Sequence, residues 1–412
     1  MLEAEKMKKI ILLAGLVAGG VALSATAFAN NWLLYLPAII SGSGGGNEPA
    51  PNKKSYNLLL FMPAILAGSQ GGTEPEPPVE VTGALNDTGI ITSVANNDDA
   101  KYGRDANPET SINNDDGHAG FSFTKLNSTG NALDATAESW SCVQDNVTGL
   151  VWSPDQKESF RWTAIEGLVN KANTESLCGK TDWRLPEVGE LVSIISYDAD
   201  SYTAGKTVDA TYFGDTQVNP RTGGLVWYWT ATAVNQDKQW GVTFQPVYDT
   251  DTQYVSLSNT LVATEAVESN PVRLVSGTIA ISNFTPIGDG STVQDNNTGL
   301  IWKRCLEGQT FSNGNCSGTG TGKTWTQALA LDDGTWRVPN IKELHSLVGK
   351  EEYFPTPTTT TGEYVWSSSP YAGNTQNSWL INFKDGLLWN AISQNPTESV
   401  VYVRLVRNVP SE

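Results

Sequence analysis

The chain has 412 residues, 39% of them hydrophobic and only 17% charged, and its formal net charge is −18. Because binding to nucleic acid or to anionic membranes needs many Lys and Arg side chains, this acidic balance excludes general binding to either. Two histidines, His118 and His345, make histidine-based catalysis unexpected, while 39 glycines, 20 prolines and 14 tryptophans favour short strands and ordered loops.

The first segment has the pattern of a secretory signal peptide. Two lysines at 8 and 9 precede the apolar run 10–23, and residues 27–29 form a small-x-small cleavage motif. We expect residues 1–29 to be removed on export. An uncleaved anchor helix is the alternative, although the run falls short of the ~20 apolar residues that span a bilayer. The sequence thus predicts a secreted protein, extracellular, at the cell surface or in the periplasm, with no transmembrane span after cleavage.

Residues 30–81 contain a duplicated apolar segment. Residues 32–43 and 57–69 align on a shared Pro-Ala-Ile, and an acidic, proline-rich stretch that favours an extended linker follows each. Neither run is long enough to cross a bilayer. They either pack on the downstream domains or dock onto an envelope partner or another copy of the chain, since exposed apolar patches mark interfaces.

A longer duplication divides the rest of the chain into two copies, which we place at residues 82–278 and 279–412. Val-Gln-Asp-Asn-x-Thr-Gly-Leu-x-Trp occurs at 143–152 and again at 293–302. Further blocks return in the same order: 183–186 at 336–339, 228–232 at 365–369, 240–244 at 379–383, and 272–275 at 403–406. Such ordered self-similarity indicates a tandem pair of related domains.

Each copy is predicted to be α+β, with short antiparallel strands, two helices and long ordered loops. The Asp-Asn-x-Thr-Gly-Leu motif predicts a turn that leads into a strand, because Asn and Gly tolerate positive φ. The later blocks alternate apolar and polar residues between turn residues, which is typical of antiparallel strands. Four tryptophans of the repeated blocks are expected in the core: Trp152, Trp183, Trp302 and Trp336.

The helices of each copy are predicted from apolar spacing. The first covers 162–177 in one copy and 325–331 in the other. The second starts at Pro186 or Pro339, because the first helical position tolerates a missing N–H. The side chains expected on inner faces are Ala164, Leu168, Ala328, Leu329, Leu191, Ile194, Ile195, Leu344, Leu347 and Val348.

Four cysteines in an exported chain predict two disulfides. They allow three pairings, and sequence position favours Cys142–Cys178 and Cys305–Cys316, each within one copy. No Cys-x-x-Cys occurs, so thiol redox chemistry and a zinc ribbon have no support.

Residues 83–140 form a leader that has no counterpart before the second copy. Its Asp/Asn/Gly loops, with Asp115 and Asp116, are weak candidates for a calcium site built from hard oxygen ligands. Their spacing does not match a helix–loop–helix calcium motif, so turn chemistry is the preferred interpretation. No cofactor is expected.

In its repeated motifs, among them Asp-Asn-x-Thr-Gly-Leu-x-Trp, Trp-Arg-x-Pro-x-x-x-Glu-Leu and the closing Val-Arg-Leu-Val, the chain resembles the Lcl C-terminal domain family. The family is named after a collagen-like bacterial surface adhesin, and the resemblance covers about residues 82–407. That fold is similar to C-type lectins and formylglycine-generating enzymes, so the resemblance implies two tandem C-type-lectin-like modules in a secreted or surface-attached protein. For the adhesin it implies binding to sulfated glycans, attachment and biofilm formation. The collagen-like stalk, the calcium-dependent sugar motifs and the enzymes' copper-site cysteines are missing here, so the resemblance implies no inherited catalysis.

The binding candidates are aromatic and basic side chains. Exposed rings can contact sugars, and the aromatic candidates in expected loops or strand edges are Trp227, Tyr228, Tyr248, Tyr254, Tyr371 and Trp389. The basic candidates for an acidic glycan lie in the second copy: Lys303, Lys323 and Lys384. Arg184 and Arg337 are instead expected to be buried arginines that each bridge an acid and loop carbonyls. His345 is expected on a solvated or half-buried helix face.

The sequence therefore predicts a secreted or surface-associated adhesion protein that binds glycan through lectin-like modules and is not an enzyme. The main alternative is an envelope structural or assembly protein that acts through protein–protein contacts of segments 32–43 and 57–69. A secreted hydrolase with paired carboxylates is the third hypothesis. Glycan or an envelope protein is the expected partner, nucleic acid is not, and homo-oligomerisation is left open.

Overall fold

The computed structural model describes residues that all belong to the unit Gly72–Glu412. They are 85–103, 119–156, 158–198, 205–218, 225–235, 238–246, 258–261, 269–278, 283–350, 352–355, 364–383, 386–392 and 401–409. The signal-peptide segment, both apolar repeats, Asp115, Asp116, Tyr248, Tyr254 and Lys384 lie outside these residues. Within these ranges, no helix has the length and apolar character that a membrane span requires.

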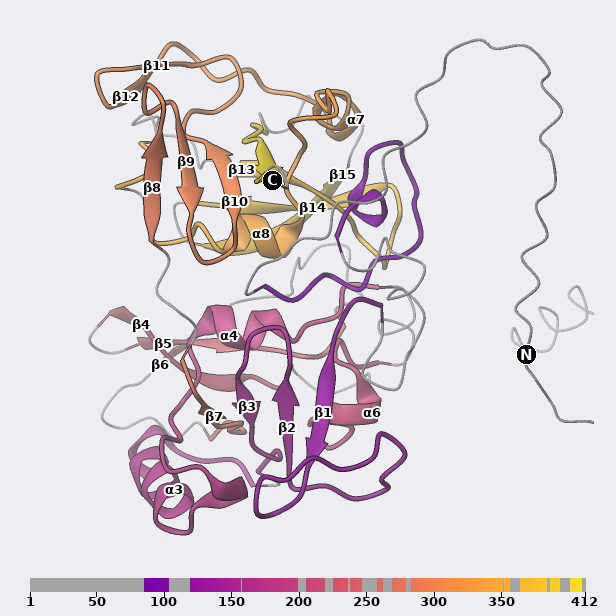
Figure 1. The fold of residues 1–412 in the computed structure, drawn as a ribbon, viewed down its shortest axis with the longest axis vertical. Helices are drawn as coiled ribbons and strands as arrows, with labels where there is room; N and C mark the ends of the chain where they lie inside the picture. Colours follow the sequence, from indigo (N-terminus) through magenta and orange to yellow (C-terminus); the bar gives the residue numbers. More distant parts are fainter. Residues whose placement is uncertain are drawn as a thin grey trace, which may run out of the picture. The chain divides into compact units, whose positions relative to one another are not determined.

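The first copy contains two antiparallel sheets (Figure 1). The larger has the order β1-β2-β3-β7, formed by Phe123–Leu126, Cys142–Asp145, Val151–Trp152 and Val275–Ser276. The smaller has the order β4-β5-β6, formed by Tyr228–Asn235, Lys238–Val242 and Ser258–Leu261. The predicted turn joins β2 to β3: Asp145 Oδ1 accepts hydrogen bonds from Val147 N at 3.0 Å and Thr148 N at 3.2 Å. Gly149 completes the turn at φ +76°.

The second copy repeats this topology and adds a hairpin. Its larger sheet has the order β16-β10-β9-β8, formed by Val406–Asn408, Leu300–Lys303, Thr292–Asp295 and Phe284–Ile287. Its smaller sheet has the order β13-β14-β15, formed by Tyr364–Pro370, Asn377–Asn382 and Leu387–Ile392. The hairpin β11-β12 covers Thr310–Ser312 and Asn315–Ser317. The predicted tandem α+β architecture is confirmed.

The helices lie where the apolar spacing placed them, with shorter bounds. The first copy has α3 (Trp162–Thr174), η2 (Leu177–Gly179), α4 (Val188–Ser193) and an unpredicted α6 (Ala210–Phe213). The second has α7 (Trp325–Leu329) and α8 (Ile341–His345), and the leader adds η1 (Asp99–Lys101).

Three predictions about the helices were wrong in detail. Ala164 is exposed and Ile165 is buried in its place, so the inner face of α3 is shifted by one residue. Pro186 and Pro339 precede the N-caps, because Glu187 and Asn340 form capping boxes and occupy the position before the first helical residue. His345 is buried, with 7% of its surface exposed.

The same ion pair fixes α4 and α8 to their sheets, half-buried in the first copy and buried in the second. Arg184 donates to both carboxylate oxygens of Glu190, at 2.7 and 2.5 Å, and also to the Gly277 carbonyl. Arg337 donates to both oxygens of Glu343, at 2.7 and 2.6 Å. The bridging role predicted for these two arginines is confirmed, since each is held by a bidentate bond to an acid on the following helix, but the predicted burial is wrong for Arg184, whose side chain is 33% exposed.

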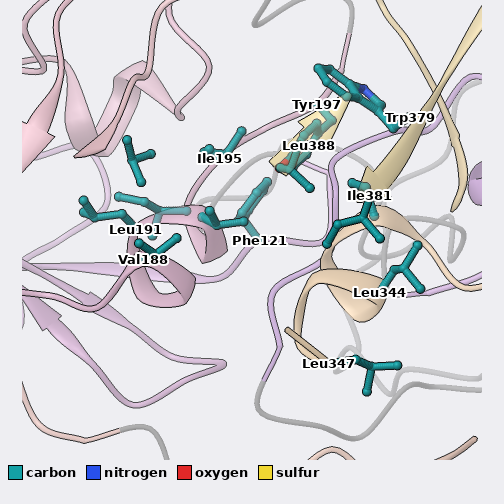
Figure 2. Packing of buried hydrophobic residues seen from close by; sticks show 14 of the residues in the cluster. Phe121, Val188, Leu191, Ile195, Tyr197, Leu344, Leu347, Trp379, Ile381 and Leu388 are labelled. Atoms are coloured by element: carbon teal, nitrogen blue, oxygen red, sulfur yellow. The ribbon is translucent and has the colours of Figure 1, made fainter. Parts of the chain in front are cut away.

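The predicted disulfides, Cys142–Cys178 and Cys305–Cys316, are both present. The hydrophobic cores of the two copies join in one cluster, which includes Leu191 of α4 and Leu344 of α8 (Figure 2). Tyr197 of the first copy meets Trp379 of the second edge-on, with ring centroids 5.6 Å apart. The two copies therefore pack together through apolar side chains.

The first described part of the leader, residues 85–103, contacts both copies; we call these residues the leader segment. Asn86 Nδ2 donates to Asp145 at 2.5 Å, and Tyr197 N donates to the Thr88 carbonyl at 2.8 Å. On the second copy, Ser369 Oγ donates to Asp99 at 2.6 Å and Lys342 Nζ donates to the Asp87 carbonyl. No such role was predicted for the leader segment, which ties the two copies to each other.

Candidate functional site

The tryptophan that follows the first helix is placed differently in the two copies. In the first copy, Trp183 is 2% exposed, and its Nε1 donates to the Leu177 carbonyl at 2.9 Å. The side chain of Asn173, on α3, hydrogen-bonds to the backbone N–H and carbonyl of Trp183. The long helix α3, of 13 residues, thus covers this indole.

In the second copy, the equivalent Trp336 is only half-buried, which corrects the prediction that it lies in the core. Helix α7 has 5 residues and supplies no counterpart of Asn173. The backbone of Trp336 is held instead by Asp333, whose Oδ1 accepts from Trp336 N at 2.7 Å. This bond lowers the pKa of Asp333 and keeps its carboxylate charged. A shorter helix therefore leaves the indole partly open to solvent.

Two cations flank this open indole. Lys303 Nζ and Arg407 Cζ each lie 5.2 Å from the ring centroid of Trp336. They come from adjacent strands, because Ile301, two residues before Lys303, pairs with Arg407 across β10 and β16. Among the described residues neither cation forms an ion pair, and Arg407 Nε is buried without a hydrogen-bond partner. We call Lys303, Trp336 and Arg407 the cation–indole site.

The first copy lacks this site. Ser153 stands where the second copy has Lys303, and Ser276 stands where it has Arg407. The two copies also differ in net charge. Residues 82–278 carry 26 Asp and Glu against 12 Lys and Arg, whereas residues 279–412 carry 12 Asp and Glu against 9 Lys and Arg. In the part of the chain that the structure describes, the cation–indole site is therefore present in the second copy alone, and by sequence the first copy is the more acidic of the two.

Among the described residues, the predicted aromatic candidates are divided between the two copies, and two of them are buried. Tyr228 is fully buried and its hydroxyl donates to Asp155 at 2.5 Å, so its assignment as a ligand-binding residue was wrong. Burial raises the pKa of this phenol. Tyr371 is 9% exposed, with its ring against Trp379 at 5.1 Å. Trp227 and Trp389 are half-buried, on different copies.

Of the basic residues predicted to bind glycan, Lys303 and Lys323 lie in the described part of the chain, and they have different surroundings. Lys303 belongs to the cation–indole site, whereas Lys323 is half-buried and its backbone carbonyl accepts from Trp366 Nε1 at 2.9 Å. The sequence analysis missed Arg407 and the exposure of Trp336. A signal for both was available: the two Ser-to-basic differences between the copies, together with the shorter first helix of the second copy.

Asp155 and its neighbour Asp215 are bound by other residues of the fold, whereas His345 is buried and its Nε2 has no hydrogen-bond partner within the described ranges. Asp155 is buried, its pKa is raised by that burial, and it accepts from Tyr228 and from Gln217 N at 3.0 Å. Its neighbour Asp215 is bound by Arg273 at 2.8 Å. His345 has its pKa lowered to about 4 by burial, so its imidazole is neutral at pH 7. The described residues contain no group of three or more His, Cys, Asp or Glu side chains that could hold a metal ion.

The comparison with family models decides the identity of the duplicated unit. Residues 141–268 and 291–407 each match the model of the Lcl C-terminal domain. The chain belongs to the Lcl C-terminal domain family. The two Lcl domains lie inside the predicted bounds 82–278 and 279–412, which stay a prediction, and membership places the chain in a surface-adhesin-like family. Neither a curated protein nor a solved structure matches the chain.

Proposed function

We propose that this protein is an exported, surface-associated adhesion protein whose second Lcl domain binds an acidic glycan at the cation–indole site. The observation that supports this is the placement of Lys303 and Arg407 beside the half-open ring of Trp336, with no ion pair to either cation in the described part of the chain. The two disulfides are in keeping with an oxidising compartment outside the cytoplasm.

The chemistry of the three side chains suits a sulfated or carboxylated sugar. Arg407 presents a planar donor fork that matches two oxygens of a carboxylate or sulfate, and Lys303 adds a second positive charge. The indole of Trp336 is amphipathic and offers apolar contact to a sugar ring at its open edge. The ring also contacts the charged ends of both cations, which reduces the side-chain entropy lost when a ligand binds.

The acidic remainder of the chain limits the type of ligand. At physiological ionic strength, exposed charges are screened beyond about 8 Å, so the local cations act at contact distance despite the net charge of −18. A long polyanion would extend over acidic surface as well. We therefore propose a short acidic stretch of glycan, bound without catalysis, and binding that weakens as salt is added.

A glycan array probed with the full chain tests this proposal, at low and at physiological salt and with calcium or chelator. We expect selective binding to acidic glycans, and Lys303→Gln, Arg407→Gln and Trp336→Ala should each weaken it about tenfold, which is about 1.4 kcal/mol. Lys180→Gln is the matched control, since it removes the same charge from an exposed position in the first Lcl domain. Binding that survives all three variants, or no binding to any glycan, would overturn the proposal.

A further inference from the structure

A small pocket lies where the leader segment and the two Lcl domains meet. It has a volume of about 140 Å³, and apolar atoms form most of its wall. The residues that line it come from three parts of the chain: Ile90, Ile91, Thr92 and Val94 of the leader segment, Tyr197 and Asp198 of the first domain, and Pro370, Tyr371, Ala372 and Thr375 of the second. A cavity of about 150 Å³ holds one benzene molecule, so this pocket fits one large apolar side chain.

The surface beside this junction pocket is unusually apolar. Three large hydrophobic side chains are exposed among the described residues, and two of them, Ile91 at 46% and Val94 at 42%, line the pocket. The third, Val409 at 39%, follows β16 and does not line it. Apolar side chains gathered around a pocket are typical of a protein-binding surface.

The backbone at this place can also receive a peptide. Ile91, Thr92 and Ser93 make no backbone–backbone hydrogen bond within the described ranges, although they run directly past the pocket. An extended peptide can pair with such free N–H and C=O groups while one of its side chains enters the neighbouring pocket. The expected occupant is therefore an extended, apolar segment with a large side chain.

The chain itself contains two segments of this chemistry, 32–43 and 57–69. Neither carries a charged residue, which suits a pocket whose only ionisable wall residues are Tyr197, Asp198 and Tyr371. Aligned on their prolines, they place an aromatic residue at the same position, Tyr35 in one and Phe61 in the other. Residues 70–84, which connect them to the leader segment, can extend to about 50 Å and so leave them free to reach a neighbouring molecule.

We propose that the junction pocket binds one of these apolar segments from a second copy of the chain, with Tyr35 or Phe61 entering the pocket. Each chain carries two such segments, so one chain can serve two neighbours. The contact is head-to-tail, because the segment and the pocket are different surfaces. Such contacts give open assemblies unless the rotation between protomers closes a ring.

Sedimentation velocity of the full chain over a range of concentrations tests this proposal. The average mass is expected to rise with concentration. Ile91→Asp and the double variant Tyr35→Ala/Phe61→Ala should each weaken association at least tenfold. Ile91 is exposed, so its substitution leaves the core intact. Val409→Asp is the matched control for added charge on an exposed apolar residue, and it should associate like the wild type.

The proposal is overturned if the wild type is a monomer at every concentration, or if association is unchanged by Ile91→Asp and by the Tyr35/Phe61 double variant. Near-ultraviolet circular dichroism checks that each variant is folded. Ile91→Asp and the Tyr35/Phe61 double variant should bind glycan as the wild type does, so this test and the test of glycan binding fail independently.

Discussion

The duplicated ion pair gives a controlled test of how burial sets the cost of losing an arginine. Arg337 and Glu343 are 6% and 5% exposed, whereas Arg184 and Glu190 are 33% and 6% exposed in otherwise equivalent geometry. Removing one partner of a fully buried pair leaves an uncompensated charge and costs about 3–5 kcal/mol. Where one partner reaches solvent, water replaces part of the lost interaction, so Arg184→Ala should cost about 1–2 kcal/mol.

The capping boxes of α4 and α8 do not add to this difference, because Glu190 Oε2 accepts from Glu187 N at 2.7 Å just as Glu343 Oε2 accepts from Asn340 N at 2.8 Å. A contact of Arg337 does add to it, since its guanidinium lies 5.1 Å from the ring centroid of Tyr102 in the leader segment. We therefore expect Arg337→Ala to lower the free energy of unfolding by about 2 kcal/mol more than Arg184→Ala.

Urea denaturation with disulfides intact, followed by tryptophan fluorescence, measures both values. Arg337→Lys keeps the charge and loses the bidentate geometry, and it should fall between wild type and Arg337→Ala. Equal losses for Arg184→Ala and Arg337→Ala, or a loss below about 1 kcal/mol for Arg337→Ala, would refute the reasoning from burial.

Three further predictions concern stability. By limiting the entropy of the unfolded chain, the Cys142–Cys178 bridge, which spans 36 residues, should add about 4 kcal/mol of stability, and Cys305–Cys316, which spans 11, about 3 kcal/mol. In urea denaturation, replacing the first pair by alanine should therefore cost more stability than replacing the second, and the reverse order would count against this reasoning. Burial lowers the pKa of His345 to about 4, below its unfolded value near 6.5. The neutral imidazole therefore contributes fully to the free energy of unfolding above pH 6.5, and about 3 kcal/mol of that free energy is lost as the pH falls to 4. His345→Val should flatten this pH dependence in thermal melts, since Val192 stands at the equivalent position of the first Lcl domain; an unchanged slope would exclude the histidine as its source. Gly103 has φ +95°, and a Cβ there would lie 2.1 Å from Asp87 Oδ2, whereas Gly314 at φ +81° has open space around it. Gly103→Ala should therefore cost at least 1 kcal/mol more than Gly314→Ala in urea denaturation, and similar losses would contradict the close contact.

Local motifs allowed much of the fold to be predicted. The turn before β3 and β10 depends on Asp, Asn and Gly within six residues, and both disulfides join cysteines inside one copy. The roles of Arg184 and Arg337 follow from an acid six residues later on the next helix. In each case the partners are close in sequence, so spacing alone is informative.

The parts that could not be predicted depend on distant contacts. Tyr228 was expected at a strand edge or in a loop, yet Asp155, 73 residues away, binds its hydroxyl inside the core. Trp336 is partly exposed because helix α7 is short, and none of the repeated motifs contains a residue that predicts where this helix ends. The leader segment reaches Asn340 and Lys342 across more than 250 residues of sequence, which no local pattern records.

We propose that the second Lcl domain, and not the first, binds an acidic glycan. Isothermal titration of the full chain with a sulfated oligosaccharide, at low and physiological salt, distinguishes the two domains when wild type is compared with the double variant Lys303→Gln/Arg407→Gln. We expect one site per chain, an affinity that falls as salt is added, and a loss of about a hundredfold in the double variant, equivalent to about 2.8 kcal/mol. Equal affinity in wild type and double variant, or two equivalent sites per chain, would contradict it.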